Sequence, residues 1–428
     1  MKNNHPCSLE SIKDLTAGFL EDVLRDKWNL PNNFQRVSSV SIERVDQGIL
    51  SCVYRANVTY DFDNDDDDDQ QEEALCHSIP MEWIVKLPRD DLRLEWMFRV
   101  EKIFYETVAP MVQQAGLPFT VPRMLLATKQ CLILEGIQDI TCHPLTEGVP
   151  AEKMDFVTHA LASLHAFSWK SRIFQAKLLA LNNSPEAPPG MGQRLSPLQK
   201  EYLFTRQWRD AVEAIQIQDA SMKEFILDLC QQMECRRLRD IHNLVHTERL
   251  ACVHGDFHIA NFLFPNNDKT LQSSQSPIHD RPFLIDWAAF GYGNPMTDVA
   301  FFLVLSDIAA TNVMAWLEQY HKNLVKCNPN VRDVFSFELM LQKFRWAMLY
   351  QWMILVAYDK MSRQLAQGDN DDDLQKVEVK LKHFANVNRR AVLALYGVRG
   401  FELDKIPLAT DNEQKEARDY SREKPLTI

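Results

Sequence analysis

Membrane-spanning and secretory segments are what this sequence of 428 residues lacks. The apolar run VAFFLVL has seven residues, whereas a spanning helix needs roughly 20. The N-terminal segment MKNNHPCSLES has no apolar signal core. These absences predict a soluble, cytoplasmic protein without a membrane partner.

Paired cysteines are also lacking. The nine cysteines are an odd number, and none forms a CxxC pair. Scattered cysteines favour reduced thiols in the cytosol over a disulfide framework. Cys230 and Cys235 have no matching His or Cys pair, so a zinc site is not predicted.

No basic stretch with interleaved aromatic residues is present, and this argues against a nucleic acid partner. The formal charge of −12 comes from two acidic runs, with nine acidic residues in 61–73 and four in 368–373, so the rest of the chain carries +1. The body without these runs is therefore near neutral. The whole sequence is 46% hydrophobic, which is ample for a large globular core. Nothing in the sequence specifies an oligomeric state.

What the sequence does contain is a phosphoryl-transfer pattern in residues 251–287. ACVHGDFHIANFLF is followed, after a polar insert, by FLIDW. Phosphoryl transfer needs a carboxylate near the acceptor hydroxyl and oxygen ligands for Mg²⁺. Asp256, Asn261 and Asp286 supply those groups, and the step of five from Asp256 to Asn261 matches the kinase catalytic loop.

The two apolar runs FLF and FLID predict a hairpin that would bring Asn261 and Asp286 to one end. An Asn and an Asp suit Mg²⁺, because this ion keeps several waters and takes phosphate oxygens. Asn261 and Asp286 are therefore the predicted metal ligands.

VHGDFHIAN together with LIDWAAFGYGNPMTDVAFFL resembles the aminoglycoside phosphotransferase and choline kinase group, including its ecdysteroid-kinase-like branch. The resemblance implies an α+β, two-lobed, protein-kinase-like fold, with a small antiparallel-sheet N-lobe and a larger, mainly helical C-lobe. It also implies ATP and Mg²⁺ as cofactors. Asp256 would then accept or orient the proton of the acceptor hydroxyl.

Two further positions match the group's phosphate-holding pair. MEWIVKLP predicts a strand carrying Lys86, and FRVEKIFYETVAPMV predicts a helix carrying Glu101. Kinase-like folds hold such a lysine against the nucleotide phosphates by such a glutamate. A surface Lys and a surface Glu would be the alternative, but the order strand-Lys, helix-Glu, HGD, Asn, Asp favours the functional interpretation.

The remaining nucleotide contacts are predicted by position. Gly48 and Ser51 lie in the turn where kinases cover the phosphates, although the full GxGxxG is missing and an ordinary hairpin turn is the alternative. The segment after CLILEG resembles the linker between lobes, where backbone at Glu135 and Ile137 would bind adenine.

Two lobes and a tail are predicted. Residues 1–135 form the N-lobe, with a leading helix and the acidic insert 61–73. Residues 136–405 form the C-lobe, with the catalytic loop 251–287, and residues 406–428 form a disordered tail. The acidic insert has ligands at several EF-hand positions but Asp66 in place of the required Gly, which favours a solvated loop over a calcium site.

Several residues near the motif are interpreted as structural. His165 fits a packed, hydrogen-bonded helix residue, and neither His254 nor His258 is given a proton-transfer role. Asp298 begins an apolar helix, which favours an N-cap or a loop-organising carboxylate over a catalyst. The aromatic residues of KFRWAMLYQWMILVAY fit core packing better than an acceptor pocket.

The predicted reaction is transfer of the ATP γ-phosphate to a hydroxyl of a small-molecule metabolite. Only eleven residues separate Asp286 from Asp298, and neither DFG nor APE occurs, so there is no protein-kinase activation segment. The alternative is a catalytically silent, kinase-like nucleotide-binding or scaffold protein, for which the sparse glycine loop and the acidic inserts argue.

Overall fold

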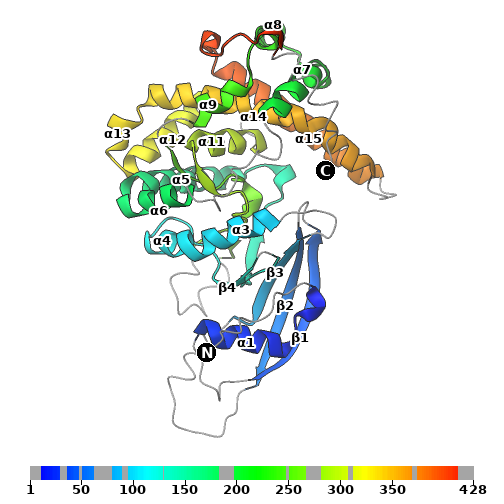
Figure 1. The fold of residues 1–428 in the computed structure, drawn as a ribbon, viewed down its shortest axis with the longest axis vertical. Coiled ribbons are helices and arrows are strands. Elements are labelled where there is room, and N and C mark those ends of the chain that lie inside the picture. The colour runs from blue at the N-terminus through cyan, green and yellow to red at the C-terminus, as the bar shows by residue number, and fades with distance from the viewer. Residues whose placement is uncertain are drawn as a thin grey trace. The chain divides into compact units, whose positions relative to one another are not determined.

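The computed structural model describes residues 11–28, 36–47, 51–61, 80–88, 95–128, 130–182, 197–246, 250–266, 281–306, 312–368 and 374–412 (Figure 1). Gly48, the acidic insert beyond Asp61 and residues 369–373 lie outside these ranges. In the part that is described, no helix is long and apolar enough to cross a membrane.

The chain forms two compact units, one of Met1–Thr141 with Leu263–Ala288 and the other of Cys142–Phe262 with Ala289–Ile428. This division differs from the predicted lobes of 1–135 and 136–405, because part of the catalytic segment returns to the first unit. Its backbone pairs there: the Leu284 N–H donates to the Thr120 carbonyl at 2.9 Å.

The first unit is built on a five-stranded antiparallel sheet with the order β1-β2-β3-β5-β4. Its strands are β1 (Arg36–Gln47), β2 (Ser51–Asp61), β3 (Glu82–Pro88), β4 (Met124–Ala127) and β5 (Leu132–Glu135). Burial alternates along β3, as period-two patterning predicts for a strand with one face on a core.

Helix α1 (Ala17–Trp28) covers one face of this sheet. A short 3₁₀ turn, Ile12–Asp14, precedes it and is capped by Ser11. Buried apolar residues of the helix pack with buried residues of β2 and β3 in one core: Leu20, Val23, Leu24, Ala56, Val58, Trp83 and Val85. The Glu21 carboxylate also accepts a hydrogen bond from the Val37 N–H at 2.7 Å, which ties the helix to β1.

A second helical segment follows β3. It runs from α3 (Glu95–Ile103) through a π-helical turn (Phe104–Val108) into α4 (Ala109–Gln114). The predicted pairing of the FLF and FLID runs is confirmed, since β8 (Phe262–Pro265) lies between β6 (Ile140–Cys142) and β9 (Phe283–Leu284) in a three-stranded sheet.

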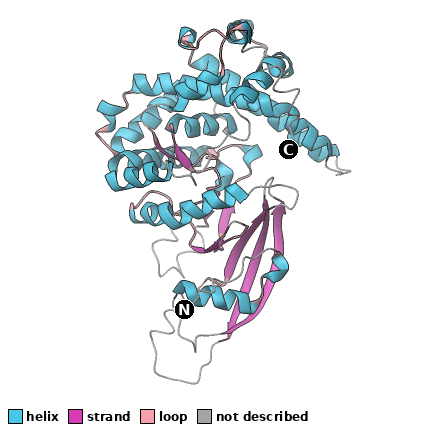
Figure 2. Cartoon of the chain, viewed as in Figure 1, coloured by secondary structure: helices cyan, strands magenta, loops and turns pink. Residues whose placement is uncertain are grey.

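The second unit is mainly helical (Figure 2). Its helices are α5 (Ala151–Lys170), α6 (Arg172–Asn182), α7 (Pro197–Ala214), α8 (Ala220–Glu234), α9 (Arg239–His246), α11 (Pro295–Leu305), α12 (Val313–Cys327), α13 (Val331–Val334), α14 (Phe337–Gly368) and α15 (Leu374–Gly397). Helix α5 packs on α12, and α14 packs on α7, α11 and α15. The antiparallel sheet of one unit and the helices of the other confirm the predicted α+β class, with a smaller sheet-containing unit and a larger, mainly helical one.

A two-stranded sheet in this unit carries the start of the catalytic segment. Strand β7 (Ala251–Val253) pairs antiparallel with β10 (Gly291–Gly293), and Asp256 follows β7 closely. The three aromatic residues considered for an acceptor pocket, Trp346, Tyr350 and Trp352, are buried. This agrees with the core-packing interpretation of the α14 aromatics.

The predicted disordered tail was placed from residue 406, but the first residues after that point are packed. Ile406 is fully buried, the Arg237 N–H donates to the Pro407 carbonyl, and Leu408 forms a β-bridge with Arg236. The charge-rich composition of the tail concealed this short apolar anchor. Residues 413–428 lie outside the described ranges.

Candidate active site

Strand β3 and helix α3 hold the predicted phosphate-binding pair together within the first unit. The Lys86 Nζ lies 2.9 Å from both carboxylate oxygens of Glu101 and 3.0 Å from Oδ1 of Asp286. Glu101 is buried and Lys86 is largely so, whereas the Asp286 side chain is 40% exposed. One ammonium therefore bridges a buried carboxylate and an accessible one.

The charge of Lys86 is maintained by these two neighbours. Burial by itself would lower the pKa of Lys86, but the charges of Asp286 and Glu101 and their hydrogen bonds outweigh it and raise the pKa. These two carboxylates therefore favour the charged form of Lys86.

The backbone at Asp286 is held in an unusual conformation. Its φ is +63°, in the left-handed region that few residues other than glycine adopt. The next residue, Trp287, stacks on Phe104 with ring centroids 3.9 Å apart and an interplanar angle of 8°. Phe104 begins the π-helical turn, and such turns are frequent at functional sites. The stack fixes the residue beside Asp286.

The second unit brings together the other predicted residues. The Asn261 amide nitrogen donates to the backbone carbonyl of Asp256 at 2.8 Å, and His258 Nε2 lies 3.4 Å from Asp256 Oδ1. The Asp256 side chain is 30% exposed, so it can meet a ligand. Since the Asn261 nitrogen is engaged with the backbone, its side-chain oxygen is the atom that can face a cation.

Asp298 organises the loop that leads to Asp256. Its Oδ2 accepts from the His254 N–H at 2.7 Å and its Oδ1 from the Gly255 N–H at 2.8 Å. Asp298 is 1% exposed and lies in the first turn of α11. The N-cap of that helix is Asn294, so Asp298 is the loop-organising carboxylate of the two alternatives left open by the sequence.

Gly255 is required at its position for two reasons. Its φ is +82°, and a Cβ there would lie 2.2 Å from the Ala289 carbonyl oxygen. His254 beside it is fully buried, and its Nδ1 accepts from the Asp256 N–H at 3.2 Å. Both residues shape the loop, in agreement with the architectural interpretation of His254.

Some backbone groups of the predicted adenine-binding segment are already hydrogen-bonded within the sheet. The Glu135 N–H donates to the Arg123 carbonyl at 2.8 Å, and the Gly136 N–H donates to the Glu82 carbonyl at 2.7 Å. The Glu135 carboxylate is bound to the Arg123 guanidinium. Adenine recognition would therefore use the Glu135 carbonyl and the Ile137 backbone. Ser51 is the first residue of β2 and pairs with Pro88 of β3. Gly48 lies outside the described residues.

The structure thus gathers the predicted residues into two groups. Lys86, Glu101 and Asp286 are in contact in the first unit, and Asp256 and Asn261 are in contact in the second. The sequence did not predict the stack of Phe104 on Trp287. Its signal was available in the motifs E-x-x-F-Y and IDW, which place an aromatic residue near each of two charged ones.

The donor set fits Mg²⁺. Asn261 and Asp286 offer oxygen atoms, which this hard cation prefers, and two protein oxygens suffice because phosphates and waters complete its shell. Among the residues described, no cluster of three or more His, Cys, Asp or Glu side chains is arranged for a metal. The described residues therefore do not form a site in which protein side chains alone complete the coordination of a metal.

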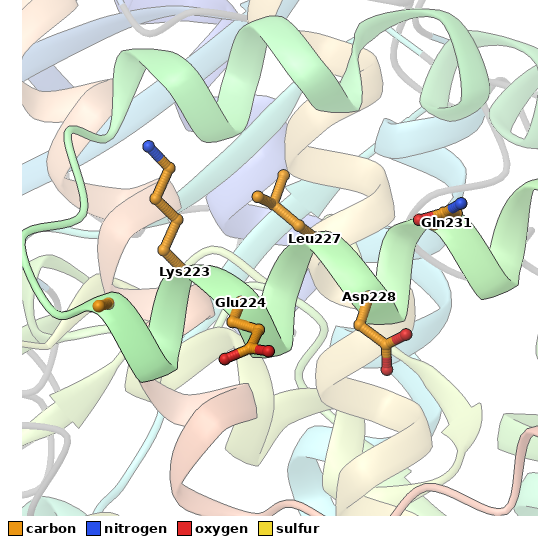
Figure 3. A pocket seen from close by; sticks show the side chains of 6 residues that line it. Lys223, Glu224, Leu227, Asp228 and Gln231 are labelled. Atoms are coloured by element: carbon orange, nitrogen blue, oxygen red, sulfur yellow. The ribbon is translucent and has the colours of Figure 1, made fainter.

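A shallow hollow lies on α8 (Figure 3). It is lined by Ala220, Lys223, Glu224, Leu227, Asp228 and Gln231. All six come from one helix, so no polar groups converge from several elements as they do in ligand sites. None of the predicted site residues is among them.

Comparisons with known proteins were made for the whole chain. The family model described as the ecdysteroid kinase-like family matches residues 47–332. That segment contains Lys86, Glu101, Asp256, Asn261 and Asp286. No curated protein matches the sequence.

Three solved structures that match most of this chain are the following. A choline/ethanolamine kinase family protein from Mesorhizobium loti is 13% identical, with 88% of this chain and 99% of that chain covered and a TM-score of 0.40. The choline kinase LicA from Streptococcus pneumoniae is 16% identical, with 88% of this chain and 99% of that chain covered and a TM-score of 0.42. An ADP-bound aminoglycoside phosphotransferase is 14% identical, with 87% of this chain and 98% of that chain covered and a TM-score of 0.37.

Proposed function

Because the chain belongs to the ecdysteroid kinase-like family, we propose that it is an ATP-dependent phosphotransferase that moves the γ-phosphate to a hydroxyl of a small-molecule metabolite. The observation that carries this proposal is the bridge from Lys86 to Glu101 and Asp286. A buried glutamate that fixes a lysine beside an accessible aspartate is the arrangement that phosphoryl transfer needs.

Asp256 is the proposed catalytic residue. The acceptor hydroxyl gives its proton to the Asp256 carboxylate as its oxygen bonds to the γ-phosphorus. The bond from that phosphorus to the β,γ-bridging oxygen breaks, and ADP leaves. General-base assistance of this kind contributes roughly 10²- to 10⁴-fold in rate. The partial exposure of Asp256 and the loop geometry fixed by Gly255 support this role.

Lys86, held by Glu101, is proposed to bind the nucleotide phosphates, and Asn261 and Asp286 are the proposed ligands of Mg²⁺. The bound ion would supply charge neutralisation at the phosphate oxygens. For adenine we propose the carbonyl of Glu135 and the backbone of Ile137. Gly48 and Ser51 are proposed to cover the phosphates.

The hydroxyl compounds to compare as phosphate acceptors are choline-like amines, sugars, aminoglycosides, sterols and hydroxylated xenobiotics. A short link between Asp286 and Asp298 leaves no protein-kinase activation segment, which supports a small acceptor over a protein.

The test is Mg²⁺-dependent ADP release by the purified full chain with pools of these hydroxyl compounds. We expect at least one pool to stimulate release, and the Asp256→Asn variant to lose about 10²-fold or more of the stimulated rate. The same variant should still bind ATP, because Lys86 and Glu101 are intact. ATP binding without stimulation by any pool would favour the silent, scaffold-like alternative.

A further inference from the structure

A chain of buried polar groups leads from α12 through α5 to the loop that carries Asp256. The Tyr320 hydroxyl of α12 lies 2.6 Å from Nδ1 of His165 in α5. The opposite ring nitrogen of His165, Nε2, lies 3.3 Å from Oδ2 of Asp298. His165 and Tyr320 are both fully buried. The carboxylate they reach is the one that binds the His254 and Gly255 N–H groups.

The direction of these hydrogen bonds follows from chemistry. A carboxylate oxygen only accepts, so Nε2 of His165 carries a proton and donates to Asp298. In a neutral imidazole the other nitrogen is then an acceptor, and the Tyr320 hydroxyl donates to it. Tyr320 thereby selects the tautomer of His165 that can hold Asp298. Without that hydroxyl the ring could move its proton to Nδ1 and turn a lone pair toward the carboxylate.

Two further contacts hold Tyr320 and helix α5 in place. The Tyr320 ring stacks on Trp316 at 5.7 Å with an interplanar angle of 12°. On α5, the Ser168 hydroxyl accepts from the Cys252 N–H of β7 at 2.9 Å. Helix α5 therefore contacts the catalytic segment at two places, directly at β7 and through Asp298 at the loop.

We infer that Tyr320 and His165 are positioning residues for Asp256, acting through Asp298 on the backbone of residues 254–256. The inference rests on the proposed function, in which Asp256 is the base. Neither side chain touches the reacting groups, so their effect is on the placement of the Asp256 carboxylate. They should influence the rate of transfer and not the affinity for ATP, because the proposed nucleotide contacts of Lys86, Glu135 and Ile137 belong to the first unit.

The competing explanation is ordinary packing between α5 and α12. The chain offers a matched control for it, because the Trp316 Nε1–H donates to the Thr158 hydroxyl at 3.0 Å. This bond is buried and joins the same two helices. Trp316 also stacks on Tyr320, but the Thr158 hydroxyl is not one of the groups that link Tyr320 to Asp298. Thr158→Val removes the hydroxyl while keeping the shape of the side chain.

The experiment compares steady-state kinetics of the full chain with Tyr320→Phe and Thr158→Val, well below the melting temperature of each. We expect Tyr320→Phe to lower kcat about tenfold with the KM for ATP unchanged, since a lost buried hydrogen bond has roughly that effect on a rate it controls. Thr158→Val should leave kcat unchanged. Equal losses in the two variants, or no loss in Tyr320→Phe, would overturn the inference.

A rescue variant tests the tautomer argument. In His165→Gln the amide N–H can donate to Asp298 without help from Tyr320. We expect this variant to keep more activity than His165→Leu, and the addition of Tyr320→Phe to it to cause little further loss. Full additivity of the two losses would contradict a chain of dependent hydrogen bonds.

Amide hydrogen exchange provides a readout that does not need turnover. The His254 and Gly255 amides should exchange about tenfold faster in Tyr320→Phe than in wild type or Thr158→Val, because their acceptor is less well held. If the wild type turned over no acceptor, the proposed function would fail while this comparison still decided the inference. Identical exchange in all three proteins would refute the positioning role.

Discussion

Single residues in this protein differ sharply in what burial does to their charge. Lys86 is buried with two carboxylates and keeps its proton. Lys200, on α7, is 2% exposed, and its described partner is the Tyr350 hydroxyl at 2.7 Å. Burial lowers the pKa of Lys200 to about 8. A buried ammonium bound to a neutral phenol is a cost to stability that the proposed chemistry does not use.

Replacing this lysine should stabilise the protein. Since its ordinary pKa of 10.5 falls to about 8, the folded state resists protonation, and at pH 7 the full cost is present. We expect Lys200→Met to raise the free energy of unfolding by about 2 kcal/mol at pH 7, after allowing for the lost Tyr350 hydrogen bond. Urea denaturation of both proteins measures the difference.

The stabilising effect of Lys200→Met should depend on pH. Between about pH 8 and pH 10.5 the unfolded chain holds more protons at Lys200 than the folded chain, so this residue's contribution to stability rises with pH. The advantage of Lys200→Met should therefore shrink across that window. The quantity to follow is the difference in free energy of unfolding between Lys200→Met and the wild type. Buried thiols such as Cys131, whose pKa is raised to about 12 by burial, make the stability of both proteins fall as the pH rises, and this contribution cancels in the difference. A constant difference from pH 7 to 10 would contradict the argument.

Some single residues could be proposed from the sequence because they occur in a recognisable motif, and others could not. Asp256 and Asn261 were proposed because their spacing matches that of the kinase catalytic loop, and Asp286 because it ends the apolar run FLID. Lys200 was not recognised, although its helix places Phe204 and Trp208 on the same buried face. A lysine in an apolar stripe is normally taken to extend its charge into water, and only the packed structure reveals that it does not.

At the scale of elements, the segment from α3 to α4 depends on its contact with the residue after Asp286. Trp287 is fully buried, stacks on Phe104, and donates from Nε1 to the Leu284 carbonyl at 3.0 Å. The sequence predicted the strand with Lys86 and the helix with Glu101. It did not predict the π-helical turn Phe104–Val108 that follows α3.

Two substitutions of Trp287 separate the contribution of the ring stack from that of the indole hydrogen bond. Trp287→Ala should lower the free energy of unfolding by about 3–5 kcal/mol, the usual cost of deleting a buried large aromatic ring. Trp287→Phe keeps a ring for Phe104 and loses mainly the hydrogen bond, so about 1–2 kcal/mol is expected. Urea denaturation followed by far-UV circular dichroism compares them. Equal losses in both variants would show that stacking is not the main contribution.

The start of the chain illustrates a second limit. The sequence predicted one leading helix in the N-lobe, whereas the described part begins with a 3₁₀ turn capped by Ser11, and α1 starts at Ala17. The Thr16 hydroxyl accepts from the Phe19 N–H at 3.2 Å. Two capping residues close together break the helix at a point that hydrophobic periodicity alone does not reveal.

At the scale of the whole molecule, the chain divides its proposed site residues between two compact units. The first unit contains Lys86, Glu101 and Asp286, and the second contains Asp256 and Asn261. Sequence order suggested a single boundary near residue 135. The structure has the chain cross between units after Thr141, Phe262 and Ala288. Among the described residues of the returning segment, the backbone of Asn266 pairs with Asp139, and that of Pro282 and Leu284 pairs with Thr120. Such a return is a property of tertiary pairing and leaves no local signal.

The central claim is that the γ-phosphate ends on a carbon-bound oxygen of a small molecule. The most direct measurement is identification of the product after incubation with [γ-³²P]ATP, Mg²⁺ and the stimulating hydroxyl compound, by chromatography and mass spectrometry. The account predicts a labelled phosphate monoester of that compound, formed by the wild type and lost in both Asp256→Asn and Asp286→Asn. Label found only as inorganic phosphate, or a monoester formed equally well by the two variants, would contradict it.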